Sequence, residues 1–236
     1  MSTKDFSNEF DVLLDSYRRF KSYDDKDILD SIEVNEYEKS IFLTQAQEEL
    51  VLEIYTGRNL YNDSFEKTEE IRRYLSPLIK TVTLTSKEEA NKGISPLSVF
   101  YKLPDNLLFI TYESVNIEDE KLGCLSGNDI TVVPVTQDDF HKIKKNPFRG
   151  YNKKRVLRLD AENNTAELVS EYNISSYTIR YLSKPNPIIL INLSNNLEIN
   201  NISKETNCDL NPILHRIILD RAVRKALISK GFNIEK

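Results

Sequence analysis

The sequence predicts an α+β fold, with helices near both ends and a largely antiparallel β region between them. In the first third of the chain and again near its end, apolar residues recur at spacings of three and four, the period of a helix. Between residues 81 and 200, short runs rich in β-branched and aromatic residues alternate with turn signals. The sequence contains no internal repeat and no Ser/Gly linker, so we expect residues 1–236 to form a single compact domain.

Residues 1–80 are expected to be mainly helical. The first helix is predicted from Asp5 to Phe20 by its apolar face. The second is predicted to begin at Thr44, because Gln47 three residues later completes a capping box, and to end at Gly57. A third is expected from about Ser64 to Ile79, with Pro77 near its end.

Residues 81–200 are expected to be mainly β. A tight turn at residues 104–106 predicts a hairpin between the strands on either side of it, and Pro134 suggests an edge position or a bulge in its strand. Thr136 is expected to cap a short helical segment, and residues 161–164 to form the turn of a second hairpin. The predicted strands are residues 81–85, 98–103, 107–117, 129–136, 154–160, 165–171, 177–182 and 187–193.

The chain is expected to end in a long helix within residues 208–231. Asn211 is a favourable N-cap, Pro212 a favourable first helical residue, and Gly231 a favourable stop. The apolar residues between them lie on one face, so this helix should pack on the sheet or on the early helices.

Composition is that of an ordinary globular protein. The chain has 39% hydrophobic and 29% charged residues, which is too apolar for disorder and too charged for a membrane protein. Its first residues lack the basic and apolar regions of a signal peptide, so we expect synthesis in a cytoplasm.

No constellation of residues predicts catalysis or a cofactor. The six glycines are scattered, with no phosphate-binding spacing. Cys124, His141, Cys208 and His215 match the ligand count of a zinc site, but their order fits no paired-ligand spacing, and we expect no metal. Cys208 lies just before a predicted helix, so a nucleophilic pair with His215 is conceivable, although a small apolar role under the helix is favoured.

The strongest local feature is a basic segment, residues 141–158, in a chain of net charge -5. It lies in a hairpin arm expected over residues 141–170 and contains eight Lys or Arg and no acid. Contact with an acidic protein surface is favoured, while a solvated hairpin and a nucleic-acid contact, with stacking by Phe140, Phe148 and Tyr151, stay open. A suitable acidic surface exists in residues 24–38, which contain seven acids and one base. A basic arm on one copy could meet this segment on the next, and such a heterologous contact can close a ring.

Several stretches resemble the neck proteins of crAss-like bacteriophages. They include "YEKSIFLTQAQEELVLEIYTGRN", "KNPFRGYNKKRVLRLD", "YTIRYLSKPNPIIL" and "CDLNPILHRIILDRAV", and they follow the same order over nearly the whole chain. The resemblance implies a virion structural protein, a ring or adaptor between portal and tail that forms a twelve-fold ring on the portal, through which the genome leaves. It carries no catalytic motif. A nucleic-acid-binding factor using residues 141–158 is the alternative.

Candidate contact residues come from three places: the basic segment, the acidic segment and the apolar face of the first helix. The helix residues could dock on a neighbouring subunit or pack on the chain's own core. The candidates are Lys144, Lys145, Arg149, Lys153, Lys154, Arg155, Arg158, Asp24, Asp25, Asp27, Asp30, Phe6 and Phe10.

Overall fold

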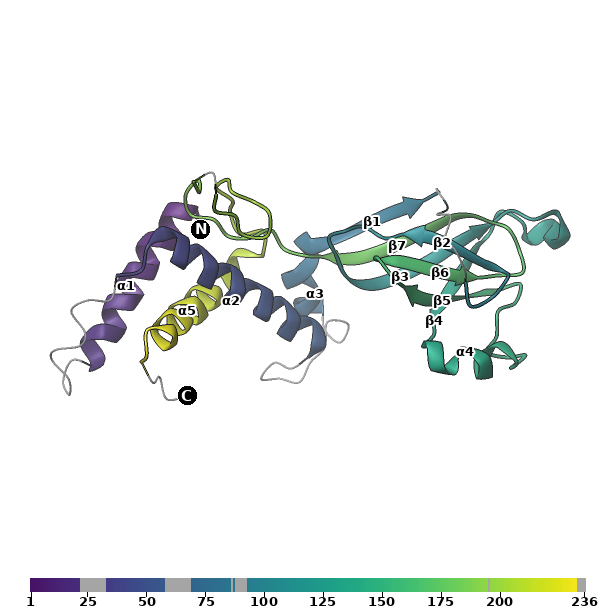
Figure 1. The fold of residues 1–236 in the computed structure, drawn as a ribbon, viewed down its shortest axis with the longest axis horizontal. Helices are drawn as coiled ribbons and strands as arrows, with labels where there is room; N and C mark the ends of the chain where they lie inside the picture. The colour runs from purple at the N-terminus through teal and green to yellow at the C-terminus, as the bar shows by residue number, and fades with distance from the viewer. Residues whose placement is uncertain (22–32, 58–68, 86, 88–92, 195, 233–236) are drawn as a thin grey trace. The chain divides into compact units, whose positions relative to one another are not determined.

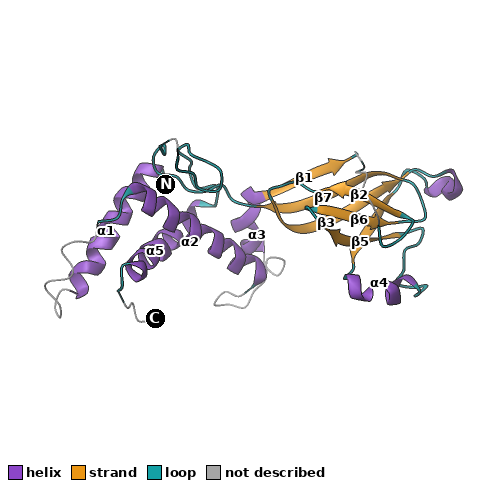
Figure 2. Cartoon of the chain, viewed as in Figure 1, coloured by secondary structure: helices purple, strands orange, loops and turns teal. Residues whose placement is uncertain are grey.

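The computed structural model describes residues 1–21, 33–57, 69–85, 87, 93–194 and 196–232 (Figure 1). The chain combines helices with one seven-stranded sheet, so the predicted α+β class is confirmed. Figure 2 draws the helices in purple and the strands in orange. The chain divides into two compact units, one of Met1–Leu78 with Lys184–Lys236 and one of Ile79–Ser183. We call them the helical unit and the β unit. The expectation that residues 1–236 form one compact domain stays a prediction.

The helical unit is built from α1 (Thr3–Lys21), α2 (Glu36–Thr56) and α5 (Pro212–Ser229), together with the short α3 (Glu69–Leu75). Helix α5 packs on both α1 and α2. Its predicted N-cap is confirmed, because the Asn211 side chain accepts a hydrogen bond from the Ile213 N–H at 3.1 Å. The core combines residues from the two ends of the sequence: Phe6, Phe10, Leu14, Leu43, Leu50, Ile54, Ile218, Ala222, Val223 and Leu227.

The predicted start of α2 at Thr44 is wrong. The capping box is formed by Asn35 and Glu38, and the helix ends at Gly57, as predicted, with that glycine in the left-handed conformation at φ 74°. Thr44 is buried inside the helix, where its hydroxyl donates to the Ser40 carbonyl at 2.8 Å. The sequence Asn-x-x-Glu has the same capping pattern nine residues earlier, at the end of the acidic segment.

The predicted strand at residues 187–193 is also wrong. Within it only Ile189 makes a β-bridge, an isolated one with Thr206. The N–H of Ile188 donates to the Thr44 hydroxyl at 3.1 Å, and that of Leu190 to the Ser40 hydroxyl at 3.0 Å. The hydroxyls of two α2 side chains therefore accept the hydrogen bonds that these N–H groups would otherwise donate to a neighbouring strand.

The β unit contains β1 (Ile79–Leu84), β2 (Ser98–Lys102), β3 (Leu107–Ile117), β4 (Asp129–Pro134), β5 (Arg155–Ala161), β6 (Thr165–Val169) and β7 (Ile174–Ser183). Their order across the sheet is β1-β7-β3-β4-β5-β6-β2. Neighbours are antiparallel except β4 and β5, which are parallel. The predicted hairpin of β5 and β6 is confirmed, with Asn163 and Asn164 at φ 55° and 57° in its turn.

Two predictions about this sheet are wrong. β2 and β3 do not form a hairpin across residues 104–106, because β2 pairs with β6 while β3 lies between β7 and β4. β4 is not an edge strand, and its register with β3 and β5 contains no bulge. Pro134 is tolerated because it is the last residue of the strand, beyond the part that pairs with β3.

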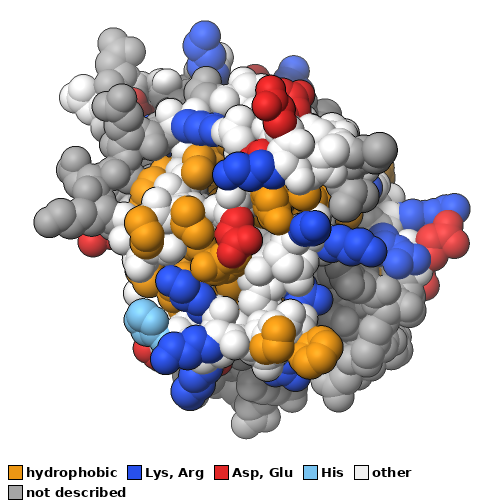
Figure 3. Space-filling view, turned by 90° about the vertical axis from the view of Figure 1, so that its right-hand side faces the viewer, with side chains coloured by type: hydrophobic (Ala, Val, Ile, Leu, Met, Phe, Trp, Pro, Cys, Tyr) orange, Lys and Arg blue, Asp and Glu red, His pale blue; other side chains and the backbone are white. Residues whose placement is uncertain are grey.

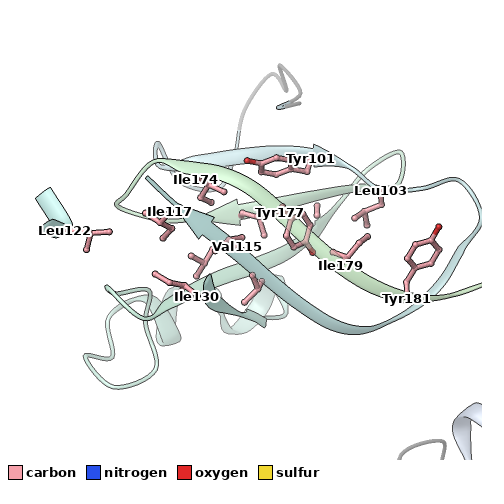
Figure 4. Close-up of a cluster of buried hydrophobic side chains, with 14 residues drawn as sticks. Tyr101, Leu103, Val115, Ile117, Leu122, Ile130, Ile174, Tyr177, Ile179 and Tyr181 are labelled. Carbon is pink, nitrogen blue, oxygen red and sulfur yellow. The ribbon is translucent and has the colours of Figure 1, made fainter. Parts of the chain in front are cut away.

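Side chains from the sheet meet in one apolar core (Figure 4). Tyr101 of β2 and Tyr177 of β7 lie there with ring centroids 5.5 Å apart, although their strands are not neighbours in the sheet. A smaller cluster joins Phe140 of α4 (Gln137–Lys144) to Leu157 and Leu159 of β5. Helix α4 therefore packs on β5, and it holds the beginning of the basic segment.

Candidate functional site: a basic loop with an exposed aromatic side chain

The basic segment runs from the end of α4 through a loop into β5. Its cations fall into two groups. The exposed ones are Lys142, Lys144, Lys145, Arg149, Lys153 and Lys154, whereas Arg155 and Arg158 are partly buried. Figure 3 shows one face of the molecule on which Lys and Arg side chains are spread around hydrophobic ones. Within the described parts of the chain, Lys145, Arg149, Lys153 and Lys154 form no ion pair.

The loop at residues 146–150 is held in one shape by Asn146. Its side-chain oxygen accepts hydrogen bonds from the N–H of Phe148 at 2.9 Å and of Arg149 at 3.2 Å. Its carbonyl accepts the Gly150 N–H at 2.8 Å. A Cβ at Gly150 would lie 2.8 Å from that same carbonyl oxygen, so glycine is needed for this close approach.

Phe148 projects from this loop and is 84% exposed. The guanidinium of Arg155 donates a hydrogen bond to the Phe148 carbonyl, which fixes the backbone beneath the ring. The other two aromatic residues predicted to stack on bases are placed differently: Phe140 is fully buried, and Tyr151 is partly buried against the same cluster. The segment thus offers one exposed aromatic ring on a fixed backbone, surrounded by cations.

Arg158 belongs to the interior of the β unit. Its side chain is 11% exposed and lies 3.0 Å from a Glu113 oxygen, and it also pairs with Asp160. Glu113 in turn accepts a hydrogen bond from the Tyr177 hydroxyl at 2.6 Å. Burial and the neighbouring Glu113 carboxylate raise the pKa of Tyr177. This buried group of charges makes Arg158 part of the core, which a count of basic residues could not reveal.

The remaining candidate contact residues are placed as follows. Phe6 and Phe10 are fully buried in the helical unit, and the Phe6 ring lies 5.3 Å from that of His215, so both pack on the chain's own core. Asp24, Asp25, Asp27 and Asp30 lie outside the described residues.

The helical unit has a groove between α1 and α5 that sequence reasoning did not predict. Its volume is about 440 Å³, and its lining is mostly apolar. Val12, 68% exposed, lies at its surface. The residues that line it are Asn8, Glu9, Val12, Leu13, Arg216, Leu219 and Asp220. It brings together residues from opposite ends of the sequence, so no local motif marks it.

Cys208 and His215 do not form the conceivable nucleophilic pair. The Cys208 thiol donates to the Gln47 side-chain oxygen at 3.1 Å, and His215 Nε2 lies 3.0 Å from the Leu210 carbonyl oxygen. Burial raises the pKa of Cys208 to about 11, which disfavours the reactive thiolate. Across the described residues there is no group of three or more His, Cys, Asp or Glu side chains suited to a metal ion, and no helix long and apolar enough to span a membrane.

Comparison with known proteins gives the family. The model of the family "Phage tail ring protein 3/4" matches residues 1–236. The chain belongs to this family. It is 50% identical to Ring protein 3 of Bacteroides phage crAss001 over 231 residues, which cover 98% of this chain and 96% of the relative. Ring protein 4/5 of the same phage is 32% identical over 241 residues, covering 96% and 92%. The predicted resemblance is confirmed: the chain is a crAss-like phage ring protein, a structural component of the virion.

Proposed function

We propose that this ring protein assembles with copies of itself into a twelve-fold ring and acts as an adaptor in the head-to-tail connector, or neck. The ring docks on the portal protein, bridges to the tail through other ring proteins, and continues the channel through which DNA leaves. The match to the ring protein family along the entire chain carries this proposal. Synthesis takes place in the cytoplasm of the bacterial host, before assembly into the virion.

The contact between subunits that we propose joins the basic segment of one copy to the acidic residues 24–38 of the next. It is supported by charge and exposure: Lys153 and Lys154 are exposed and form no ion pair in the described chain. Opposite charges on two different surfaces of one chain favour a heterologous contact, which repeats around an axis until it closes.

The proposed role is structural, without a catalytic step. The Cys208 thiol is partly buried and donates a hydrogen bond to Gln47, and its raised pKa is the reverse of what a nucleophile needs. No cofactor is part of the proposal. The protein works by holding surfaces in a fixed arrangement.

The exposed cations also support the alternative of DNA contact, either as a nucleic-acid-binding factor or non-specifically in the channel. Six exposed Lys or Arg lie within residues 141–154. If they contact phosphates, replacing Lys153 and Lys154 by alanine should weaken DNA binding and reduce its salt dependence. Binding that shows no salt dependence would remove this alternative.

Electron microscopy of the purified protein, with and without its portal partner, tests the proposal directly. Rotational averaging of any rings would give their symmetry, and we expect twelve-fold rings stacked coaxially on the portal. A monodisperse monomer that joins no ring, alone or with the portal, would overturn the proposed function. Monomers that bind DNA would favour the alternative.

A further inference from the structure

Helix α1 lies on a surface formed by α2 and α5 (Figure 1). Its side chains Phe6 and Phe10 are fully buried, and the Phe6 ring lies 5.3 Å from that of His215 on α5. Polar contacts continue along the helix, since the Tyr17 hydroxyl donates to Asp220 of α5 at 2.9 Å. We call the surface that receives α1 the α1-binding surface, and its residues are Glu36, Lys39, His215 and Asp220.

A buried cation makes this surface selective. Lys39 is 3% exposed, and its ammonium group donates to the Asp11 carboxylate of α1 at 2.8 Å and to the Ser7 hydroxyl at 3.2 Å. Its third partner, at 2.8 Å, is Glu36 of its own helix. An occupant without a carboxylate at this place would bury the ammonium group with one anion fewer, which is costly. The surface therefore fits a helix with the side-chain pattern of α1.

A second copy of the chain carries that pattern. If α1 of one copy lay on the α1-binding surface of another, it would make the same apolar contacts, hydrogen bonds and ion pair as in its own chain. The exchange loses no contact between α1 and this surface, which is why exchanging identical elements is a low-cost route to oligomers. Helix α1 and its binding surface are different parts of one chain, so the contact is heterologous and can repeat until a ring closes.

A long connection joins α1 to α2. Its fourteen residues, 22–35, can span about 46 Å when fully extended, which exceeds the diameter of a small domain, about 30 Å. An exchanged α1 would draw this connection across the boundary between two copies, and the connection contains most of the acids of residues 24–38. The proposed function brings those acids to the same boundary, but the exchange itself depends on the described contacts of α1 and not on net charge.

We propose that α1 is exchanged between copies in the ring, with α1 of each copy lying on the α1-binding surface of the next. This rests on the proposed function, because it names a contact that holds neighbouring copies together. In a dilute monomer α1 lies on its own chain, where its effective concentration is high. In the ring, the further contacts between copies favour the exchanged form. The occupant is a second copy, because α1 itself supplies the carboxylate of Asp11 and the two buried phenylalanines.

Cross-linking between two differently tagged, co-expressed proteins tests the exchange in a background of Cys124→Ser with Cys208→Ser. One protein carries Ser7→Cys and the other Glu36→Cys, because Ser7 Oγ and Glu36 Oε1 lie 2.8 Å apart. A short bis-maleimide should join the two proteins into a heterodimer only if α1 of one lies on α2 of the other. Glu9→Cys replaces Ser7→Cys in the control, because Glu9 is exposed and two residues further on, which places it on the opposite side of α1. Equal yields for the two mixtures would overturn the proposal.

A second experiment uses one protein that carries both Ser7→Cys and Glu36→Cys in the same background. Treating assembled rings with the bis-maleimide should give covalent oligomers of many chains on a denaturing gel, whereas packing of α1 on its own chain gives single chains only. Treating the dilute monomer instead with a reducible bis-maleimide ties α1 to its own chain. We expect this protein to form no rings until a reductant cuts the link. Rings that form with the link intact would overturn the proposal.

The outcomes separate the exchange from the proposed function. Rings whose cross-links all lie within single chains would overturn the exchange and leave the ring function standing. Cross-linked heterodimers without rings in the microscope would support the exchange and overturn the ring. A protein that forms no rings and cross-links only within single chains would overturn both.

Discussion

At the scale of single residues, the charge of the basic segment that matters most for stability is the least exposed one, on Arg158. Arg158 pairs with Glu113, whose side chain is 8% exposed. Replacing Arg158 with methionine would leave that carboxylate buried without its cation, which costs about 3–5 kcal/mol of unfolding free energy. Lys153→Met, an exposed base on the same segment, should change stability by less than about 0.5 kcal/mol. Urea denaturation of the two variants checks this, and equal midpoints would contradict the structural role of Arg158.

The thiol of Cys208 gives a second prediction at this scale. Its pKa is raised to about 11, chiefly by burial, from an ordinary value of 9.0. At pH 9 the native thiolate fraction, and with it the rate of alkylation by iodoacetamide, should be roughly 50-fold lower than in the urea-unfolded chain. A Cys124→Ser variant isolates this thiol for mass spectrometry.

The same shift makes stability depend on pH. Because the folded state holds the thiol proton more tightly, Cys208 contributes stability that is complete below about pH 9 and is lost as the pH rises towards 11. Cys208→Ser removes that loss. A native thiol that reacts as fast as the unfolded one would contradict the burial seen here and reopen a nucleophilic role.

At the scale of elements, α2 holds the segment that follows β7 through two hydroxyl groups. Thr44→Val would leave the buried Ile188 N–H without its acceptor and should cost about 1–3 kcal/mol, whereas Thr44→Ser keeps the hydroxyl. Thr56→Val is the control, because its hydroxyl bonds only the exposed Leu52 carbonyl of the same helix. Thermal unfolding distinguishes them, and a Thr44→Val protein as stable as Thr56→Val would contradict this account.

These hydroxyl contacts also explain why part of the fold could not be predicted from the sequence. Helices α1 and α5 and the β5–β6 hairpin follow from local period, caps and turns. Helix α4 follows Thr136 as predicted, although the Thr136 side chain makes no capping hydrogen bond. The segment at 187–193 has the composition of a strand, but its donors are satisfied by α2, a tertiary effect that overrides propensity. The turn at residues 104–106 likewise led to the wrong prediction of a β2–β3 hairpin, because β2 pairs with β6, more than sixty residues further along the chain.

The candidate site, too, could be predicted from the sequence only in part. A charge count found the basic segment, residues 141–158. The exposure of Phe148 depends on which aromatic residues α4 and β5 bury, and the α1/α5 groove depends on how two sequence-distant helices pack. Neither the exposure of Phe148 nor the groove can be predicted from a local sequence pattern.

At the scale of the whole molecule, a chain of net charge -5 carries a segment with eight bases and no acid. Like-charged copies would repel one another unless their opposite charges are brought face to face, so the arrangement favours one mutual orientation over others. Exposed pairs of this kind are screened by salt. Ring assembly should therefore weaken as ionic strength rises.

Charge reversal tests that arrangement. Lys153→Glu with Lys154→Glu should prevent or strongly weaken ring assembly, because the reversed side chains would face the acidic residues 24–38 of the next copy. Lys102→Glu with Lys121→Glu is the matched control: both lysines are exposed in the β unit and the net charge changes equally. Adding Asp24→Lys and Asp25→Lys to the first variant should restore rings in part, since it gives the two new glutamates basic side chains to face. Rings that survive the Lys153 and Lys154 reversal as well as they survive the control would show that this part of the segment faces solvent.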